Sequence, residues 1–376
     1  MCSASDPTGI SRFEAKSCKW LVLNKSVRHW KLQRFSTIVK GTQVRTIRPS
    51  ALCKRISLLF VASVCTWGGP TVAIAADYPA KAIRLVVGFP AGGASDVVAR
   101  AIAQKMSERL GQSVVVDNRP GAASNVGSDF VARAAPDGYT ILFGTISLAI
   151  NPGLYPKLTY NPLLDLTPIS MISSAPFLLV VNPASPLYTV RDLITAAKTR
   201  KGSPDLNYAT AGNGSGSHLF TELFSNSAGI QLTHVPYKGA APAMNDVLGN
   251  QVPITFDNII TTLPLVKSGK LRALAVSTKQ RSKVAPDIPT LEEAGVAGFN
   301  ATSWFGLFAP AGTPKNIIAR LNLETNEALK EPAVREKLLS MGAEPTPGTA
   351  SEFDTFFQSE VARWGKVVRD AKVQID

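Results

Sequence analysis

Cysteine is absent from most of this chain. The four cysteines among its 376 residues all precede residue 76: Cys2, Cys18, Cys53 and Cys65. Residues 76–376 therefore have no thiol, which excludes a disulfide framework and a thiolate metal site there. The same span has only two histidines, His218 and His234, so we expect no zinc centre and no other bound metal.

The excess of basic residues is confined to the N-terminal part of the chain. The formal net charge of +13 would by itself suggest a nucleic-acid partner. However, residues 1–75 contain 12 of the 40 Lys and Arg residues and only two of the 27 Asp and Glu residues. Residues 76–376 keep 28 basic and 25 acidic residues, a net charge of +3, so no nucleic-acid partner is expected.

The common enzyme motifs are missing as well. The glycine-rich stretches match neither the dinucleotide motif G-x-G-x-x-G nor the phosphate-binding motif G-x-x-x-x-G-K-[ST], and no G-x-S-x-G nucleophile elbow occurs in them. No acid–base constellation stands out from the rest of the chain. We therefore predict a protein that is not an enzyme, with no catalytic residues and no cofactor.

The N-terminal segment has the pattern of a secretory signal. Residues 45–55 contain four basic residues, and residues 56–64 are predominantly apolar but too short to span a bilayer. Ala73-Ile-Ala75 matches a small-x-small cleavage site. The pattern predicts a signal peptide at 45–75 and a periplasmic location. Residues 1–44 are expected to be a disordered upstream extension of the reading frame.

Residues 84–110 predict a strand, a glycine turn and a helix. Leu85 to Phe89 form a short apolar run typical of a buried strand, and residues 90–93, a proline and two glycines among them, interrupt it. Apolar residues then recur at helical spacing, with Ser95 or Asp96 as the expected N-cap. Such a corner can bind an anion through the free backbone N–H groups of the helix.

A second corner of this kind follows the strand-like residues 208–211. Glycines and serines fill residues 212–217, and helical spacing begins directly afterwards. Two such corners could face one cleft and bind the two ends of a doubly anionic ligand. Two ordinary turns of an α/β protein would give the same pattern, and the pattern alone does not separate these interpretations.

Strand-like and helical runs alternate through much of residues 76–376, which predicts an α/β fold with parallel strands. Three helices are expected at the end of the chain, near 314–329, 332–340 and 350–371.

Several segments in series carry a family resemblance. They include Tyr78-Pro-Ala-Lys-Ala-Ile-Arg, Asp117-Asn-Arg-Pro-Gly-Ala, Pro136-Asp-Gly-Tyr-Thr-Ile-Leu-Phe-Gly, Tyr208-Ala-Thr-Ala-Gly-Asn-Gly-Ser, Val235-Pro-Tyr-Lys-Gly and Ala309-Pro-Ala-Gly-Thr-Pro. Together these segments resemble the Bug family, the periplasmic solute-binding proteins of tripartite tricarboxylate transporters. The resemblance runs in order from about residue 78 to residue 364. At Ala91 many relatives carry a second proline or another small residue.

The resemblance implies an α/β, two-lobed type II periplasmic-binding-protein fold. Each lobe would be a sheet flanked by helices, with lobe one at 76–178 plus 303–376 and lobe two at 179–302. The strands at 177–182 and 304–309 would cross between the lobes and form the hinge.

The resemblance also implies a small carboxylate ligand, such as a dicarboxylate or a similar organic acid, in a cleft between the lobes. The positions that correspond to ligand-binding residues are Phe89, Pro90, Ala91, Gly92, Gly93 and Asp96 in the first loop, Thr210, Ala211, Gly212, Asn213, Ser215 and His218 in the second, and Ser147 and Asp257 elsewhere. Capping of the helix is our first interpretation of Asp96. Asp257 could accept an ammonium group, which would matter for an amino-acid ligand.

The implied partner is a two-subunit membrane permease to which a monomeric protein delivers its ligand. A periplasmic ligand sensor for a signalling system would share the same sequence features, and an enzyme on the same architecture is a third alternative. The sequence does not identify the ligand.

The signal-peptide pattern predicts a mature protein that begins at or close to Ala76 and contains none of the four cysteines. Mass measurement of the periplasmic fraction tests the cleavage. Thermal unfolding of the mature protein should be the same with and without reductant. A mature protein that retains Cys53 and Cys65, or whose melting temperature depends on reductant, would contradict the prediction.

Overall fold

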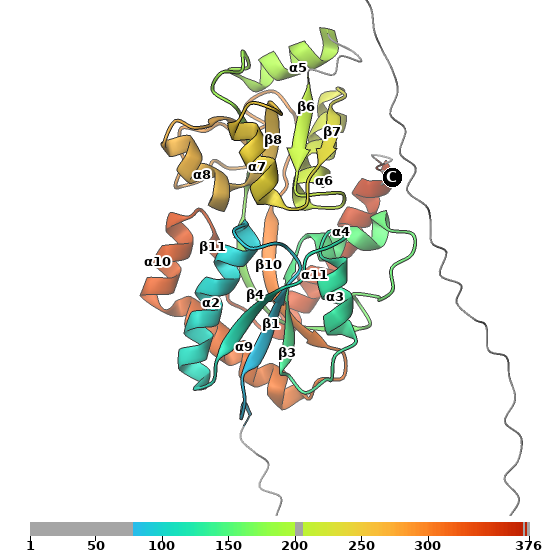
Figure 1. The fold of residues 1–376 in the computed structure, drawn as a ribbon, viewed down its shortest axis with the longest axis vertical. Helices are drawn as coiled ribbons and strands as arrows, with labels where there is room; N and C mark the ends of the chain where they lie inside the picture. The colour runs from blue at the N-terminus through green and yellow to red at the C-terminus, as the bar shows by residue number, and fades with distance from the viewer. Residues whose placement is uncertain (1–77, 200–205, 371–372, 374–376) are drawn as a thin grey trace, which may run out of the picture. The chain divides into compact units, whose positions relative to one another are not determined.

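The computed structural model describes residues 78–199, 206–370 and 373 (Figure 1). The predicted extension at 1–44 and signal peptide at 45–75 lie outside the described residues. All described residues belong to a single unit, Ile74–Asp376. None of the described helices is long and apolar enough to cross a membrane.

The first sheet has six strands in the order β11-β4-β10-β3-β1-β2. Their bounds are Ile83–Val87 (β1), Val114–Asn118 (β2), Thr140–Thr145 (β3), Leu166–Ala175 (β4), Ser303–Pro310 (β10) and Glu344–Pro345 (β11). Strand β1 pairs in parallel with β2 and β3, and β10 runs antiparallel between β3 and β4. The sheet thus combines strands from two distant parts of the chain.

The second sheet has five strands in the order β7-β6-β8-β5-β9. Their bounds are Phe177–Val181 (β5), Asn207–Thr210 (β6), Thr233–Pro236 (β7), Ile254–Asn258 (β8) and Arg272–Val276 (β9). Strand β6 is parallel to β7 and β8, whereas β5 is antiparallel to β8 and β9. The predicted α/β class with parallel strands is confirmed in both sheets.

Helices flank both sheets (Figure 1). Those packed with the first sheet are α2 (Ala94–Leu110), α3 (Asn125–Ala132), α4 (Ser147–Leu154), α9 (Lys315–Lys330), α10 (Pro332–Ser340) and α11 (Ala350–Asp370). Those in the region of the second sheet are α5 (Val190–Thr199), α6 (Gly216–Ala228), α7 (Ala240–Leu248) and α8 (Ile259–Lys267). The three helices predicted at the end of the chain agree with α9, α10 and α11 within one or two residues.

The chain crosses between the sheets twice. It leaves the first sheet after β4 at Pro176 and enters β5 at once, because Phe177 already pairs with Asn258. It returns just before β10, whose first residue, Ser303, pairs with Ala175. Phe177 and Leu178, which we expected in lobe one, therefore pair within the second sheet. Below, lobe one and lobe two denote the first and second sheets with their helices.

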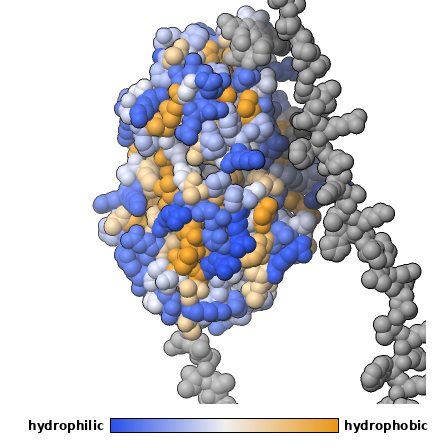
Figure 2. All heavy atoms as spheres, viewed as in Figure 1, coloured by the Kyte–Doolittle hydropathy of each residue, from blue (hydrophilic) through white to orange (hydrophobic). Residues whose placement is uncertain are grey.

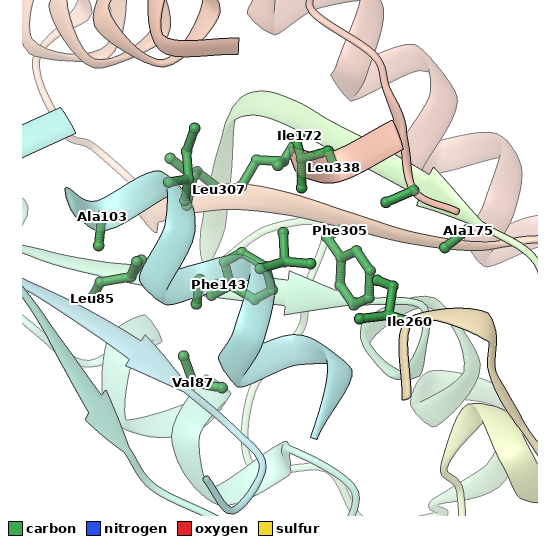
Figure 3. Packing of buried hydrophobic residues seen from close by; sticks show 14 of the residues in the cluster. Leu85, Val87, Ala103, Phe143, Ile172, Ala175, Ile260, Phe305, Leu307 and Leu338 are labelled. Carbon is green, nitrogen blue, oxygen red and sulfur yellow. The ribbon is translucent and has the colours of Figure 1, made fainter. Parts of the chain in front are cut away.

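Residues of the first sheet contribute to two apolar clusters, and Figure 3 shows part of one of them. Leu85, Phe143 and Leu307 come from three strands of this sheet and are fully buried. Burying each such side chain contributes about 1.5–3 kcal/mol. Ile260 of α8 enters the same cluster as Phe305, so the buried core continues from lobe one into lobe two.

The face shown in Figure 2 is mostly hydrophilic or of intermediate hydropathy. Hydrophobic residues appear on it in small separate groups. The large hydrophobic side chains that are exposed among the described residues are scattered in sequence: Val115, Val126, Leu163, Leu164, Tyr188 and Leu323. Isolated exposed apolar residues of this kind are normal for a globular protein.

A buried carboxylate joins the C-terminal helix to the first sheet. One oxygen of Glu360 accepts the indole N–H groups of Trp304, at 3.1 Å, and of Trp364, at 3.0 Å. Its other oxygen pairs with Arg363 at 3.2 Å. Glu360 is 5% exposed, and both indoles are completely or almost completely buried. Glu360 thus satisfies two buried donors, one on β10 and one on α11.

Replacing Glu360 by Ala should lower the free energy of unfolding by about 2–4 kcal/mol, because two buried indole donors lose their acceptor. Glu360→Gln keeps an oxygen acceptor at this position and should cost less. Urea denaturation measures both effects. Glu336→Ala, on the exposed face of α10, is the control and should change stability by less than about 0.5 kcal/mol. Equal stability of Glu360→Ala and the wild type would contradict the assigned role.

Candidate ligand-binding cleft

A cleft lies between the two lobes. Lobe one lines it with Phe89, Pro90, Ala91, Gly93, Ala94, Ser95, Thr145, Ile146, Ser147, Ser303 and Phe305. Lobe two lines it with Phe177, Ala211, Ser215, Gly216, Ser217, Ala240, Ala241, Asp257 and Asn258. The lining contains no Lys or Arg. Asp257 is its one acidic residue.

Five helices begin at this cleft. Helices α2, α4, α6, α7 and α8 contribute residues of their first turn or their N-cap to the lining. Each follows a strand that is parallel to its neighbour, so its N-terminus lies at the carboxyl edge of the sheet. The first N–H groups of a helix lack partners within the helix, and the peptide dipoles make this end partly positive. The cleft therefore attracts anions without a basic side chain.

Eight of the fourteen residues predicted from the sequence line the cleft: Phe89, Pro90, Ala91, Gly93, Ser147, Ala211, Ser215 and Asp257. Gly212 and Asn213 line an adjoining cavity of about 480 Å³, which shares three residues with the cleft. The remaining four, Gly92, Asp96, Thr210 and His218, do not line the cleft. Their structural surroundings show what they do instead.

Hydrogen bonds of a cluster of polar side chains, Asp96, Arg100 and Asn118, fix the conformation of the first loop. The predicted N-cap at Ser95 or Asp96 is wrong, since α2 begins at Ala94 and its N-cap is Gly93. Asp96 instead accepts the backbone N–H of Gly92, one position before the N-cap, at 3.1 Å. It also accepts hydrogen bonds from Arg100 and Asn118, each at 3.0 Å.

Asn118 in turn donates to the carbonyl oxygen of Phe89 at 3.0 Å, so the cluster fixes both ends of the loop. Burial by itself would raise the pKa of Asp96, but hydrogen bonds from Arg100, Gly92 and Asn118 outweigh it and hold the pKa below its usual range. Asp96 is therefore an ionised carboxylate that positions the loop.

The stacked imidazole rings of His218 and His234 form hydrogen bonds with the second loop. The hydroxyl oxygen of Thr210 lies 2.6 Å from the Nε2 atom of His234. The backbone N–H of Gly214 donates to the Nδ1 atom of His218 at 3.2 Å. The two imidazole rings are stacked with their centroids 4.1 Å apart. Burial, with a smaller contribution from His234, lowers the pKa of His218 to about 3, so His218 is neutral and can accept this hydrogen bond.

Ser215 is the N-cap of α6, and its hydroxyl accepts the backbone N–H of His218 at 3.3 Å. Its hydroxyl also lies 3.0 Å from that of Ser217, which accepts the N–H of Ala211. The serines that the sequence places between the glycines thus shape the loop, and both of them line the cleft.

Two polar side chains of the cleft lack strong partners within the protein. Ser147 is 1% exposed, and its hydroxyl has no hydrogen-bond partner among the described residues. Asp257 is 8% exposed and accepts the backbone N–H of Asn258 and, at 3.4 Å, the hydroxyl of Thr261. Burial is the dominant influence and raises the pKa of Asp257 to about 6.

Twelve of the twenty residues that line the cleft were not predicted from the sequence. Phe177 and Phe305 come from the two crossing segments, and Thr145, Asn258 and Ser303 lie at strand ends that carry no glycine motif. Ala240 and Ala241 begin α7, which follows Gly239. The segment Val235-Pro-Tyr-Lys-Gly before this helix could have predicted a third strand–glycine turn–helix corner.

Two basic residues near the loops have other roles. Arg119 pairs with Asp117 at 2.8 Å and stacks on the ring of Phe130 at 3.7 Å, and it does not line the cleft. Lys238 is exposed and lines the adjoining cavity. No group of His, Cys, Asp and Glu side chains suited to a metal ion occurs in the described part of the chain.

Two lobes joined by two crossing segments, with a cleft between them, are the architecture of a solute-binding protein. The match to known sequences gives the family. Residues 98–373 match the family described as "Tripartite tricarboxylate transporter family receptor", and the chain belongs to it. The Bug-family resemblance is confirmed, and the protein is a periplasmic solute-binding protein rather than an enzyme.

Individual relatives agree with this assignment. Protein BugT of Bordetella pertussis is 40% identical over 310 residues, which cover 82% of this chain and 94% of BugT. The structure "R. palustris Rpa4515 with adipate" is 39% identical, with a TM-score of 0.76 over 79% of this chain and 99% of Rpa4515. MatC from Rhodopseudomonas palustris with bound malate is 34% identical, with a TM-score of 0.74 over 77% of this chain and 100% of MatC.

The raised pKa of Asp257 predicts a pH dependence of stability without ligand. In the unfolded chain this carboxyl has a pKa of about 4 and ionises first, while the folded protein holds the proton up to about pH 6. Its stabilising contribution is complete below about pH 4 and is lost as the pH rises through 6, by about 3 kcal/mol in total. Denaturation of the wild type and Asp257→Asn between pH 4 and 7.5 should show this relative loss. A difference in stability that stays constant with pH would refute it.

Proposed function

We propose that this protein binds a small dicarboxylate in its interlobe cleft in the periplasm and delivers it to a two-subunit membrane permease. The observation that carries the proposal is the meeting of five helix N-termini at a cleft lined by no Lys or Arg. Termini from both lobes would each donate backbone N–H groups to one carboxylate of the ligand. The lining of the cleft, mostly apolar with a few polar side chains, is of the kind that binds small molecules.

The relatives support this ligand class. Rpa4515 was solved with adipate and MatC with malate, and both of these ligands are dicarboxylates. The unpartnered hydroxyl of Ser147 would donate a further hydrogen bond to the ligand. We place the ligand contacts at the eight predicted residues that line the cleft, with Gly212 and Asn213 at its extension.

The family description supports delivery to a transporter. In our proposal the protein reaches the periplasm through a signal peptide at 45–75 that is cleaved, and it acts there as a monomer. Purification of the mature protein with tagged permease subunits, in the presence and absence of ligand, would test the delivery step.

A thermal-shift screen of small acids tests the ligand class. Malate, adipate and intermediate dicarboxylates should raise the melting temperature, whereas adipamide, which has the length of adipate but no charge, should not. A ligand at about 100 times its dissociation constant adds roughly 2.7 kcal/mol to the stability, which corresponds to a shift of several degrees. If adipamide stabilised the protein as well as adipate, recognition of negative charge would be excluded.

Gly93 offers a direct test of the electrostatics. It lines the cleft as the N-cap of α2 with φ −82°, and a Cβ atom there would have no neighbour closer than 3.9 Å. Asn and Asp are both good N-caps, so both should preserve the fold. Gly93→Asp adds a negative charge to the cleft and should weaken dicarboxylate binding about tenfold or more relative to Gly93→Asn.

Calorimetric titration of both Gly93 variants measures the difference between a charge and a neutral group of the same shape. Arg119, which does not line the cleft, provides the control, and Arg119→Ala should bind like the wild type. The proposal fails if Gly93→Asp and Gly93→Asn bind a dicarboxylate equally well, or if Arg119→Ala alone abolishes binding.

A further inference from the structure

Asp257 does not fit a cleft built for anions. Asp257 is the only Asp, Glu, Lys or Arg in the lining of the cleft. The helix N-termini around it otherwise make the site suitable for negative charge. An ionised Asp257 would repel a ligand carboxylate, and at 8% exposure water would screen this repulsion only weakly. The carboxyl group must therefore be neutralised when an anionic ligand binds.

We propose that Asp257 binds the ligand in its protonated form, as a hydrogen-bond donor to a ligand carboxylate, so that each binding event takes up one proton. The proposal rests on the dicarboxylate-binding function proposed above. A protonated carboxyl group carries one O–H donor, which an ionised one lacks. The proton would come from solvent and stay on Asp257 while the ligand is bound.

The hydrogen-bond partners of Asp257 within the protein are few and uncharged. Thr261 on α8 donates to one carboxylate oxygen at 3.4 Å, which is a long hydrogen bond, and Asn258 donates its backbone N–H. Among the described residues no Lys, Arg or His side chain forms an ion pair with Asp257. The carboxyl group therefore has no fixed positive charge to hold it ionised.

The charged and titratable groups on the neighbouring elements are occupied elsewhere. On α6, His218 accepts the N–H of Gly214, and Glu222 accepts the hydroxyl of Tyr208 on β6. On α7, Asp246 accepts the hydroxyl of Tyr237.

The remaining neighbours add no titratable group at the cleft. Strand β5 has no titratable side chain, and Lys267 of α8 lies in the last turn of that helix, far along the chain from its cleft end. Across the cleft, α2 carries Asp96 and Arg100, which pair with each other at 2.9 Å. Burial raises the pKa of Asp257 to about 6 even without ligand, and the negative charge of a bound carboxylate would raise this pKa further.

A ligand with an ammonium group is the competing explanation. It would pair with an ionised Asp257 and need no proton. However, the same lining presents N-terminal turns of helices from both lobes, and their partly positive ends disfavour a cation. The geometry therefore favours a protonated carboxyl over a bound ammonium group.

The test is the pH dependence of binding, with adipate and malate as probes. Ordinary carboxyl groups have pKa values of about 4, so both probes stay ionised from pH 6.5 to 8.5. Over this range the wild type should lose roughly tenfold in affinity per pH unit. Asp257→Asn has the same shape, keeps an N–H donor and cannot ionise, so its affinity should stay constant. Calorimetry in phosphate and in Tris at pH 7.5 should count close to one proton taken up by the wild type and none by the variant.

Each outcome decides the question. If either probe, or another dicarboxylate from the screen, binds the wild type with an affinity that is independent of pH and without proton uptake, this inference is wrong and the proposed function stands. The inference is also wrong if aspartate binds with rising affinity as the pH increases and Asp257→Asn abolishes that binding. If no acid binds at all, the proposed function fails first. If Asp257→Asn does not fold, the pH profile and proton count of the wild type decide alone.

Discussion

The cleft depends on one constraint, the direction of the strands that lead into it. Parallel strands end at the same edge of a sheet, so the helices that follow them must begin there. In this protein five such helices, from both lobes, begin at one cleft. The peptide dipoles of these helices supply a partly positive potential that is built into the backbone, although Ser215 and Asn258 cap two of the helices. Side chains in the cleft are therefore free to be small or apolar. This explains how a protein can suit an anionic ligand with Phe177, Phe305 and several serines and alanines in its lining and no basic residue.

Backbone recognition requires loops that hold their conformation, and buried polar clusters provide this. Asp96 and Asn118 fix the first loop through its backbone N–H and C=O groups, and His218 fixes the second through a backbone N–H. None of these three side chains lines the cleft. Asp96 and His218 were predicted as ligand-binding residues, and the structure shows each of them bonded to the backbone of its loop. A charged cluster behind the loop and an uncharged surface in front of it are therefore two parts of one arrangement.

Much of the fold could be predicted from the sequence, because the α/β class, the last three helices and the first two corners depend on local patterns of apolar residues and glycines. The family resemblance extended this to the lobes. The exact helix start could not be predicted: Ser95 and Asp96 are favourable N-caps, yet the hydrogen bond from Gly92 to Asp96 moves the start to Ala94. The contributions of Phe305 and Ser303 depend on a strand that returns from far along the chain. No local pattern contains that information.

The two glycine corners also differ in a way that only the packing reveals. At Gly93 a Cβ atom would have free space, and the backbone has an ordinary φ, so the absence of a side chain leaves room in the cleft itself. Gly214 has φ +79°, and a Cβ atom there would lie 3.0 Å from atoms of Asn151 and Tyr155 on the α4 side of lobe one. The hydroxyl of Tyr155 also donates to the carbonyl oxygen of Asn213 at 3.0 Å. The glycine of the second corner thus permits close approach between the lobes, while the glycine of the first leaves open space beside the cleft.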